Sequence, residues 1–160
     1  RGKSLEDTAN WVEANKLRMR HLFTVDDLNF LRRGGRLSGA KAFVGTVLSM
    51  KPLLHIDDSG RILVIDTIRG RRKSLINMAE NLGESACDPQ SQTIFISHGD
   101  CLEEAQFLAN EIKRRFGVRE IFINVISPVI GSHSGPGTVA LFFLTPARNM
   151  ETSGQKKVYR

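Results

Sequence analysis

The chain has 160 residues, of which 41% are hydrophobic and 25% are charged. This balance excludes an intrinsically disordered protein, and one domain of this length folds without disulfides or a metal. The 23 Lys and Arg residues outnumber the 17 Asp and Glu residues, which favours an anionic partner: nucleic acid, phosphate, a carboxylate ligand, an acidic protein or a membrane surface.

Apolar runs and cysteine spacing exclude two further classes of protein. The longest apolar run, Val139–Leu144, is too short for a membrane helix, and no signal peptide is visible near Arg1. Cys87 and Cys101 have no further ligands at zinc spacing, so no metal is predicted. Two free thiols favour the cytoplasm. Because the chain begins with Arg1 rather than Met, we expect a piece of a longer protein.

The first elements in chain order are helical. Residues 4–20 are predicted as a connecting helix that begins with the capping box Ser4-x-x-Asp7, and residues 21–23 as an extended segment. Thr24 is the predicted N-cap of a short helix that ends with Arg32-Arg33 and is stopped by Gly34-Gly35.

The middle of the chain alternates helix and strand. A helix is predicted over 38–50, and Pro52 then forces extended backbone. Residues 53–57 and 61–68 are expected to form an antiparallel hairpin around a polar turn, followed by a helix over 73–82. The inward side of that helix comprises Leu75, Met78, Ala79 and Leu82.

The second half predicts the fold class. Strands are expected over 93–97, 121–126 and 138–144, with an amphipathic helix from Asp100 to Phe116 and a glycine-rich loop over 127–137. The inward side of the helix comprises Leu102, Ala105, Leu108, Ala109, Ile112 and Phe116. The order of elements predicts an α/β lobe of two layers, with a mixed sheet that includes an antiparallel hairpin and is covered by helices.

Three segments are candidates for binding. The loop Gly131–Gly137 combines glycines that let backbone amides approach a ligand with two serines and a histidine, and it suits a carboxylate or phosphate; the alternative is a flexible turn. The segment Arg32–Arg36 either binds an oxyanion or is a solvated helix end. The run Arg69–Lys73 has four cations in five residues, which favours nucleic acid or an acidic protein face over a solvated helix start.

The sequence gives little support to an enzyme. It has no P-loop, no paired-carboxylate motif and no serine with a recognisable base. The fragment Gly131–Gly135 does not match the G-x-S-x-G motif of serine hydrolases, because its central residue is His133 rather than serine. Aromatic residues do not alternate with the basic runs, which disfavours single-stranded nucleic acid. A basic nucleic-acid-binding module nevertheless stays open as the alternative function.

Three segments, in order, resemble the DegV family, the fatty-acid-binding subunits of bacterial fatty-acid kinase. They are residues 24–38 (TVDDLNFLRRGGRLS), Lys51-Pro52-Leu53-Leu54 with the Asp-Ser-Gly turn that follows, and residues 130–137 (IGSHSGPG). The resemblance implies that residues 24–148 are the C-terminal lobe of such a protein, with a connecting segment over 1–23 and a polar tail over 149–160. It also implies an N-terminal lobe, absent from this chain, that supplies further carboxylate ligands.

The same resemblance implies a function. The lobe would hold one long-chain fatty acid, without another cofactor, and present the carboxylate to a separate ATP-dependent kinase subunit that makes an acyl-phosphate. The implied ligand-binding residues are His133 with its neighbours Gly131, Ser132, Ser134 and Gly135, together with Arg33 and Arg36; Arg69 matches a kinase-docking position. Phe43, Val44, Val47, Ile65, Phe95, Phe122, Phe142 and Phe143 either line the acyl chain or form ordinary core.

Overall fold

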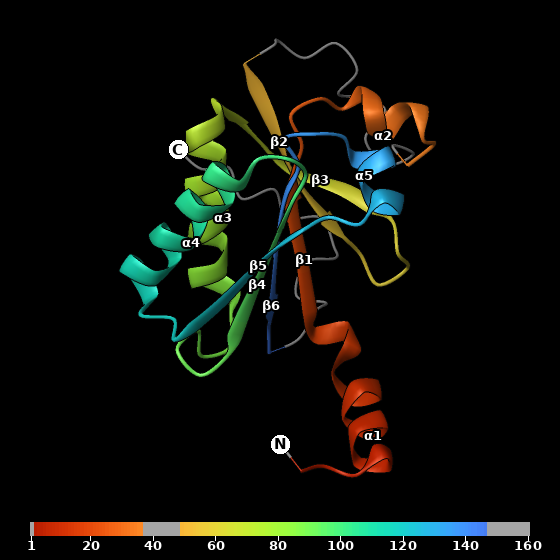
Figure 1. The fold of residues 1–160 in the computed structure, drawn as a ribbon, viewed down its shortest axis with the longest axis vertical. Helices are drawn as coiled ribbons and strands as arrows, with labels where there is room; N and C mark the ends of the chain where they lie inside the picture. Colours follow the sequence, from red (N-terminus) through yellow and green to blue (C-terminus); the bar gives the residue numbers. More distant parts are fainter. Residues whose placement is uncertain (1, 37–48, 147–160) are drawn as a thin grey trace.

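The structure, a computed structural model, describes residues 2–36 and 49–146. Its elements follow one another in an order that Figure 1 colours from red to blue. They are α1 (Leu5–Asn15), η1 (Lys16–Arg18), β1 (Met19–Thr24), α2 (Asn29–Arg33), β2 (Met50–Ile56), β3 (Ile62–Arg69), α3 (Arg71–Ser85), β4 (Thr93–His98), α4 (Leu102–Phe116), β5 (Glu120–Val125), α5 (Pro128–Ser134) and β6 (Val139–Leu144).

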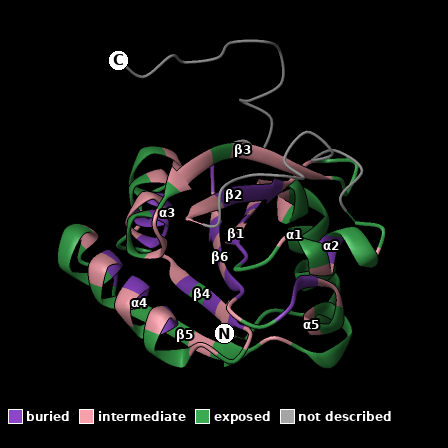
Figure 2. Ribbon diagram, turned by 90° about the horizontal axis from the view of Figure 1, so that it is seen from above, coloured by how far each residue is buried: buried purple, intermediate pink, exposed green. Residues whose placement is uncertain are grey.

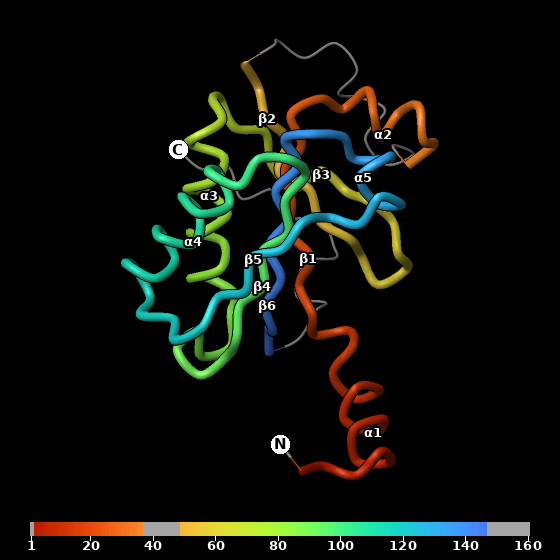
Figure 3. The backbone as a smooth tube through the Cα atoms, viewed as in Figure 1, coloured from red at the N-terminus to blue at the C-terminus, as the bar shows by residue number. Residues whose placement is uncertain are grey.

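The strands form one six-stranded sheet in the order β3-β2-β1-β6-β4-β5. Among the described strands, β4 and β5 pair in parallel, and the other neighbours pair antiparallel. β2 and β3 form the expected hairpin, with a bulge between Leu53 and Leu54. β6 lies in the middle of the sheet, between β1 and β4, and its path can be followed in Figure 3. The predicted α/β fold with a mixed sheet is confirmed.

Helices α3 and α4 cover one face of the sheet, as Figure 2 shows. Apolar side chains three and four residues apart on each helix pack against alternate strand residues such as Leu22, Ile96 and Phe143. The helix side of this core comprises Leu75, Met78, Ala79, Leu82, Ala105, Leu108, Ala109 and Ile112. These positions confirm the prediction, whereas Leu102 was wrongly placed in it and is 48% exposed.

The opposite face carries a smaller core beside α2. Val25, Leu31 and Leu54 are buried there, and the half-buried Phe23 and Leu28 pack against them. α2 and α5 lie on this side of the sheet, next to one another (Figure 2). Large side chains of β4 and β5 on the same face stay exposed, among them Phe95 and Phe122.

Four local predictions differ from the structure. The helix predicted over residues 4–20 is shorter, because α1 ends at Asn15 and β1 already begins at Met19. Thr24 is not a helix N-cap: it is the buried last residue of β1, and α2 begins only at Asn29. Cys101 rather than Asp100 is the N-cap of α4. The predicted loop over 127–137 contains the helix α5, which begins with a favourable proline at its first residue, Pro128. The helix predicted over 38–50 falls mainly on residues 37–48, outside the described residues.

The N-terminal helix extends away from the sheet (Figure 1). Ser4 is its N-cap, as predicted, and its Oγ accepts from the backbone N–H of Asp7 at 3.0 Å. No residue of α1 is buried. The predicted boundary after residue 23 falls inside β1, which is a central strand of the sheet. In the part of the chain that the structure describes, no helix is long and apolar enough to cross a membrane.

Candidate ligand-binding site

His133 lies in the last turn of α5, where the helix dipole favours positive charge. Its half-buried imidazole packs directly on the backbone of Gly34: a Cβ at Gly34 would overlap Nδ1 and lie 3.2 Å from Cγ. The two glycine-containing motifs that sequence analysis singled out separately are therefore one site, formed where α2 meets α5 (Figure 1).

Gly135 and Gly137 also allow the turn after α5 to lie close to the segment around α2. A Cβ at Gly135 would lie 2.5 Å from the ring of Phe30, and one at Gly137 would lie 2.7 Å from Cβ of Asp26. Both glycines have positive φ, +80° and +75°, which other residues rarely adopt. The turn from α5 to β6 thus lies directly against the segment that leads through α2.

Arg33 and Arg36 bring positive charge to the same junction. The guanidinium of Arg33 lies over the ring of Phe30, 4.7 Å from its centroid. Nη1 of Arg36 donates to the carbonyl of Gly34 at 2.6 Å. Both arginines are exposed, and neither forms an ion pair with a carboxylate of the described residues. Their guanidinium groups are therefore available to an incoming anion next to His133.

The other residues predicted around His133 differ in what they offer. The amides of Gly131 and Gly135 donate to Ser127 and Gly131 inside and at the end of α5, both at 2.8 Å, so they are not the free loop donors that the sequence suggested. Ser132 is exposed, and its Oγ donates to the Val129 carbonyl at 2.9 Å. Ser134 is 4% exposed, and its Oγ has no hydrogen-bond partner among the described residues.

An aromatic row crosses the open face of the sheet, which α3 and α4 do not cover. The strand register places His21 beside Phe142, Phe142 beside Phe95 and Phe95 beside Phe122. The rings of His21 and Phe142 meet edge to face at 5.3 Å, and those of Phe95 and Phe122 stack at 5.7 Å. Phe95 and Phe122 are 45% and 53% exposed, which is unusual for rings of this size.

Strand alternation decides on which face of the sheet the remaining candidates for the acyl-chain lining lie. Phe143 points to the α3–α4 side and is 1% exposed, and Ile65 packs against the same core, so both are ordinary core. Phe43, Val44 and Val47 lie outside the described residues. Sequence reasoning did not include His21 in the row, and only its cross-strand register reveals it.

The basic run after β3 is partly occupied by contacts within the chain. Arg71 pairs with Glu104, and the guanidinium of Arg72 lies 4.5 Å from the ring centroid of Phe107. Arg69 and Lys73 are exposed. Only part of the predicted positive charge is therefore free for a partner.

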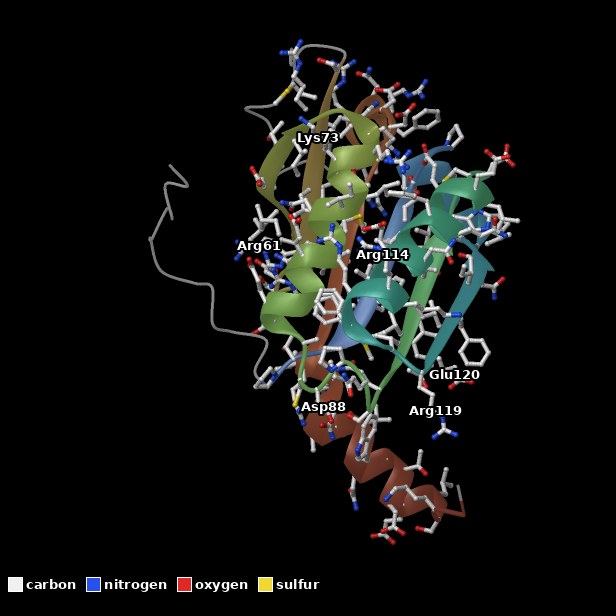
Figure 4. All side chains as sticks on the ribbon, turned by 90° about the vertical axis from the view of Figure 1, so that its left-hand side faces the viewer. Arg61, Lys73, Asp88, Arg114, Arg119 and Glu120 are labelled. Carbon is white, nitrogen blue, oxygen red and sulfur yellow. The ribbon has the colours of Figure 1, made fainter. Side chains whose placement is uncertain are left out.

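A separate pocket lies at the amino ends of β4 and β5. Its volume is about 320 Å³, and its lining consists of Ser91, Gln92, Thr93, Arg119 and Glu120. Figure 4 shows Arg119 and Glu120 at the end of the lobe next to α1, away from Lys73. Among the described residues, no group of three or more His, Cys, Asp or Glu side chains is placed to hold a metal ion.

Comparison with known proteins identifies the family. A family model described as "Uncharacterised protein, DegV family" matches residues 1–146, and the chain belongs to the DegV family. A DegV domain-containing protein of Clostridium perfringens is 46% identical over 143 residues, which are 89% of this chain and 49% of that protein. The chain thus spans about half the length of the curated relatives it matches.

Solved structures agree with this assignment. DegV from Bacillus subtilis, described as a fatty acid binding protein, is 34% identical with a TM-score of 0.72, over 89% of this chain and 50% of that chain. The Fatty Acid Kinase B3 protein of Streptococcus pneumoniae, solved with linoleic acid, has a TM-score of 0.78 over 90% of this chain and 50% of that chain. Its identity is 19%, so this second likeness concerns the fold.

Proposed function

We propose that this chain is the C-terminal lobe of a fatty-acid carrier, a binding subunit that presents the carboxylate of a long-chain fatty acid to a separate ATP-dependent kinase. The observation that carries the proposal is the junction of His133, Gly34 and two exposed arginines, Arg33 and Arg36, on the side of the sheet that bears the aromatic row. A polar group of residues and an apolar surface on the same side of the sheet match the two parts of a fatty acid.

The energetics support both halves of this site. A carboxylate loses hydration on binding, so it needs hydrogen-bond donors and positive charge, which His133, Arg33 and Arg36 supply. An acyl chain gains about 0.8 kcal/mol per buried CH₂ group, and the exposed rings of Phe95 and Phe122 offer it an apolar surface. The acyl chain is then the main source of affinity, and the head group fixes its direction.

The kinase partnership is part of the proposal. The carrier holds the carboxylate, the kinase subunit transfers the phosphoryl group from ATP, and the exposed Arg69 is a docking contact. The half of the relatives that this chain does not match would be an N-terminal lobe and would supply the remaining carboxylate ligands. We place the complex in the cytoplasm, where the kinase has access to ATP.

Mass spectrometry of the purified full-length protein tests the proposal. We expect a long-chain fatty acid to co-purify with it, and we expect acyl-phosphate to form when the kinase subunit and ATP are added. The variant H133A should bind fatty acid with about 1.5–3 kcal/mol less affinity, because a charge-assisted hydrogen bond is lost. R114A, a change of an exposed side chain on α4, is the control. A folded full-length protein without fatty acid and without affinity for it would overturn the proposal.

A further inference from the structure

Two ion pairs meet at Gly137, in the turn that follows α5. Nη2 of Arg71 donates both to Glu104 and to the carbonyl of Gly137, and Nε of Arg71 donates to Glu104 at 2.9 Å. Asp26 lies against Cα of the same glycine, and Nζ of Lys51 binds Asp26 through its carboxylate and its carbonyl. The starts of β2, α3 and α4 and the end of β1 are thus joined at one backbone position.

The two cations are more sheltered than surface ion pairs usually are. The side chains of Arg71 and Lys51 are 17% and 13% exposed, whereas that of Arg114 in a surface pair on α4 is 65% exposed. Arg71 is also the first residue of α3, where the helix dipole disfavours a cation. Glu104 lies in the first turn of α4, where a carboxylate is favoured, and offsets that cost.

Hydrogen bonds hold the residues between His133 and β6 in place. Thr138, the next residue, donates its Oγ1 to the carbonyls of Ser134 and Gly135 at 3.0 and 2.8 Å. The amide of Gly137 donates to Gly99 at 2.7 Å, and that of Gly99 donates to Thr138 at 2.8 Å. The residues directly after His133 are therefore held through Gly137 and Thr138.

We propose that Arg71 is a positioning residue: by holding the Gly137 carbonyl it fixes the turn after α5 and thereby the imidazole of His133 against Gly34. The inference deepens the proposed function and rests on it for the role of His133 toward a carboxylate. It also assigns a purpose to part of the basic run Arg69–Lys73, since Arg71 faces inward and is not available to a partner.

The test compares R71M with R114M in the full-length protein, using two measurements. In ¹H–¹³C NMR spectra of the ligand-free protein, the imidazole signal that H133Q removes should move in R71M and stay in place in R114M. Fatty-acid affinity should fall about tenfold in R71M. R71K keeps the charge but has a single nitrogen in place of the fork, and it should restore part of both effects.

The two measurements separate this inference from the proposed function. A His133 signal that stays in place in folded R71M overturns the positioning role, whatever the affinity does. If the signal moves but the wild-type protein has no affinity for fatty acid, the positioning role stands and the proposed function fails. If R71M does not fold, the same two measurements on E104Q test the positioning role, because this change removes the charge that holds Arg71 in place.

Discussion

At the scale of single residues, the candidate site depends on two glycines, Gly34 and Gly35, because a side chain at either position would change the local structure. Gly34 has an ordinary right-handed backbone, so its lack of a side chain matters only because the imidazole of His133 occupies that space. Gly35, the next residue, has φ +71° and no atom within 4 Å of a Cβ built there, so its lack of a side chain matters only for the backbone. The pair of glycines thus has two different purposes.

This difference gives a matched pair of variants. G34A should displace the His133 ring and weaken fatty-acid binding about tenfold, with little change in backbone strain. G35A should lower the free energy of unfolding by about 1–2 kcal/mol through its left-handed conformation and leave the affinity unchanged. Isothermal titration and urea unfolding of both variants check this expectation. Equal affinities in G34A and wild type would show that His133 does not depend on the Gly34 surface.

The hairpin turn gives a prediction for acid stability. The backbone N–H of Arg61, with help from Ser59, lowers the pKa of Asp57 from 3.8 to about 2. Because the folded state favours the ionised form, the stabilisation is present above pH 3.8 and is lost as the pH falls toward 2. D57N keeps one oxygen acceptor but not the charge.

Urea unfolding at pH 7, 4 and 2 measures this effect. The midpoint of D57N should lie below that of wild type at pH 7, and the gap should narrow as the pH approaches 2. D88N, which removes a carboxylate outside the hairpin, serves as the control. A gap that stays constant over this range would contradict the assignment to Asp57.

Residue patterns predicted the parts of the site but not their meeting. His133, Arg33 and Arg36 are all binding candidates in the sequence, and Gly34 lies inside the candidate segment Arg32–Arg36, but no pattern predicts that Gly34 contacts His133. Its contact with His133 joins segments far apart in sequence, and a local pattern contains no information about such a contact. The expectation that the glycine amides are free is wrong, because Gly131 and Gly135 donate within and at the end of a short helix that their composition does not predict.

At the scale of secondary structure, amphipathic elements were predictable and short ones were not. α3 and α4 have apolar residues at helical spacing, so their buried sides followed from sequence. α5 has seven residues and begins with a proline, and its glycines and serines are typical of loops. Packing against α2 holds it in helical form, which is why periodicity did not reveal it.

Strand alternation supplies a test for the aromatic row. Phe122 is 53% exposed and Phe143 is 1% exposed, although both are phenylalanines of the same sheet. F143A should lower the free energy of unfolding by about 3–5 kcal/mol, as core truncations do. F122S should leave the stability of the lobe nearly unchanged and weaken fatty-acid binding about tenfold, because apolar contact with the acyl chain is lost.

Measurement of both variants in the full-length protein separates packing from binding. Thermal unfolding reports the stability, and competition with a fluorescent fatty acid reports the affinity. Unchanged affinity in F122S would remove the stacked pair from the acyl-binding surface. A large loss of stability in the same variant would instead show that Phe122 is a structural contact in the intact protein.

At the scale of the whole molecule, the charge balance became specific only through the fold. An excess of six cations left nucleic acid, phosphate and carboxylates equally open. In the folded chain, Arg71 is paired inward with Glu104, whereas Arg33 and Arg36 are exposed on either side of the Gly34-Gly35 pair, and His133 contacts Gly34. The likeness to DegV family structures described as fatty-acid binding supports a carboxylate as the proposed partner of these exposed charges.

The central position of β6 has a consequence for how the lobe forms during synthesis. β1–β3 and β4–β5 are two separate groups of strands, and only β6 joins them. Of the strands that the structure describes, β6 is the last to leave the ribosome, so the nascent chain carries unpaired inner edges on β1 and β4 until Val139–Leu144 emerges. The sheet therefore becomes continuous in a single late step, and chaperones would find their binding surface on those two edges.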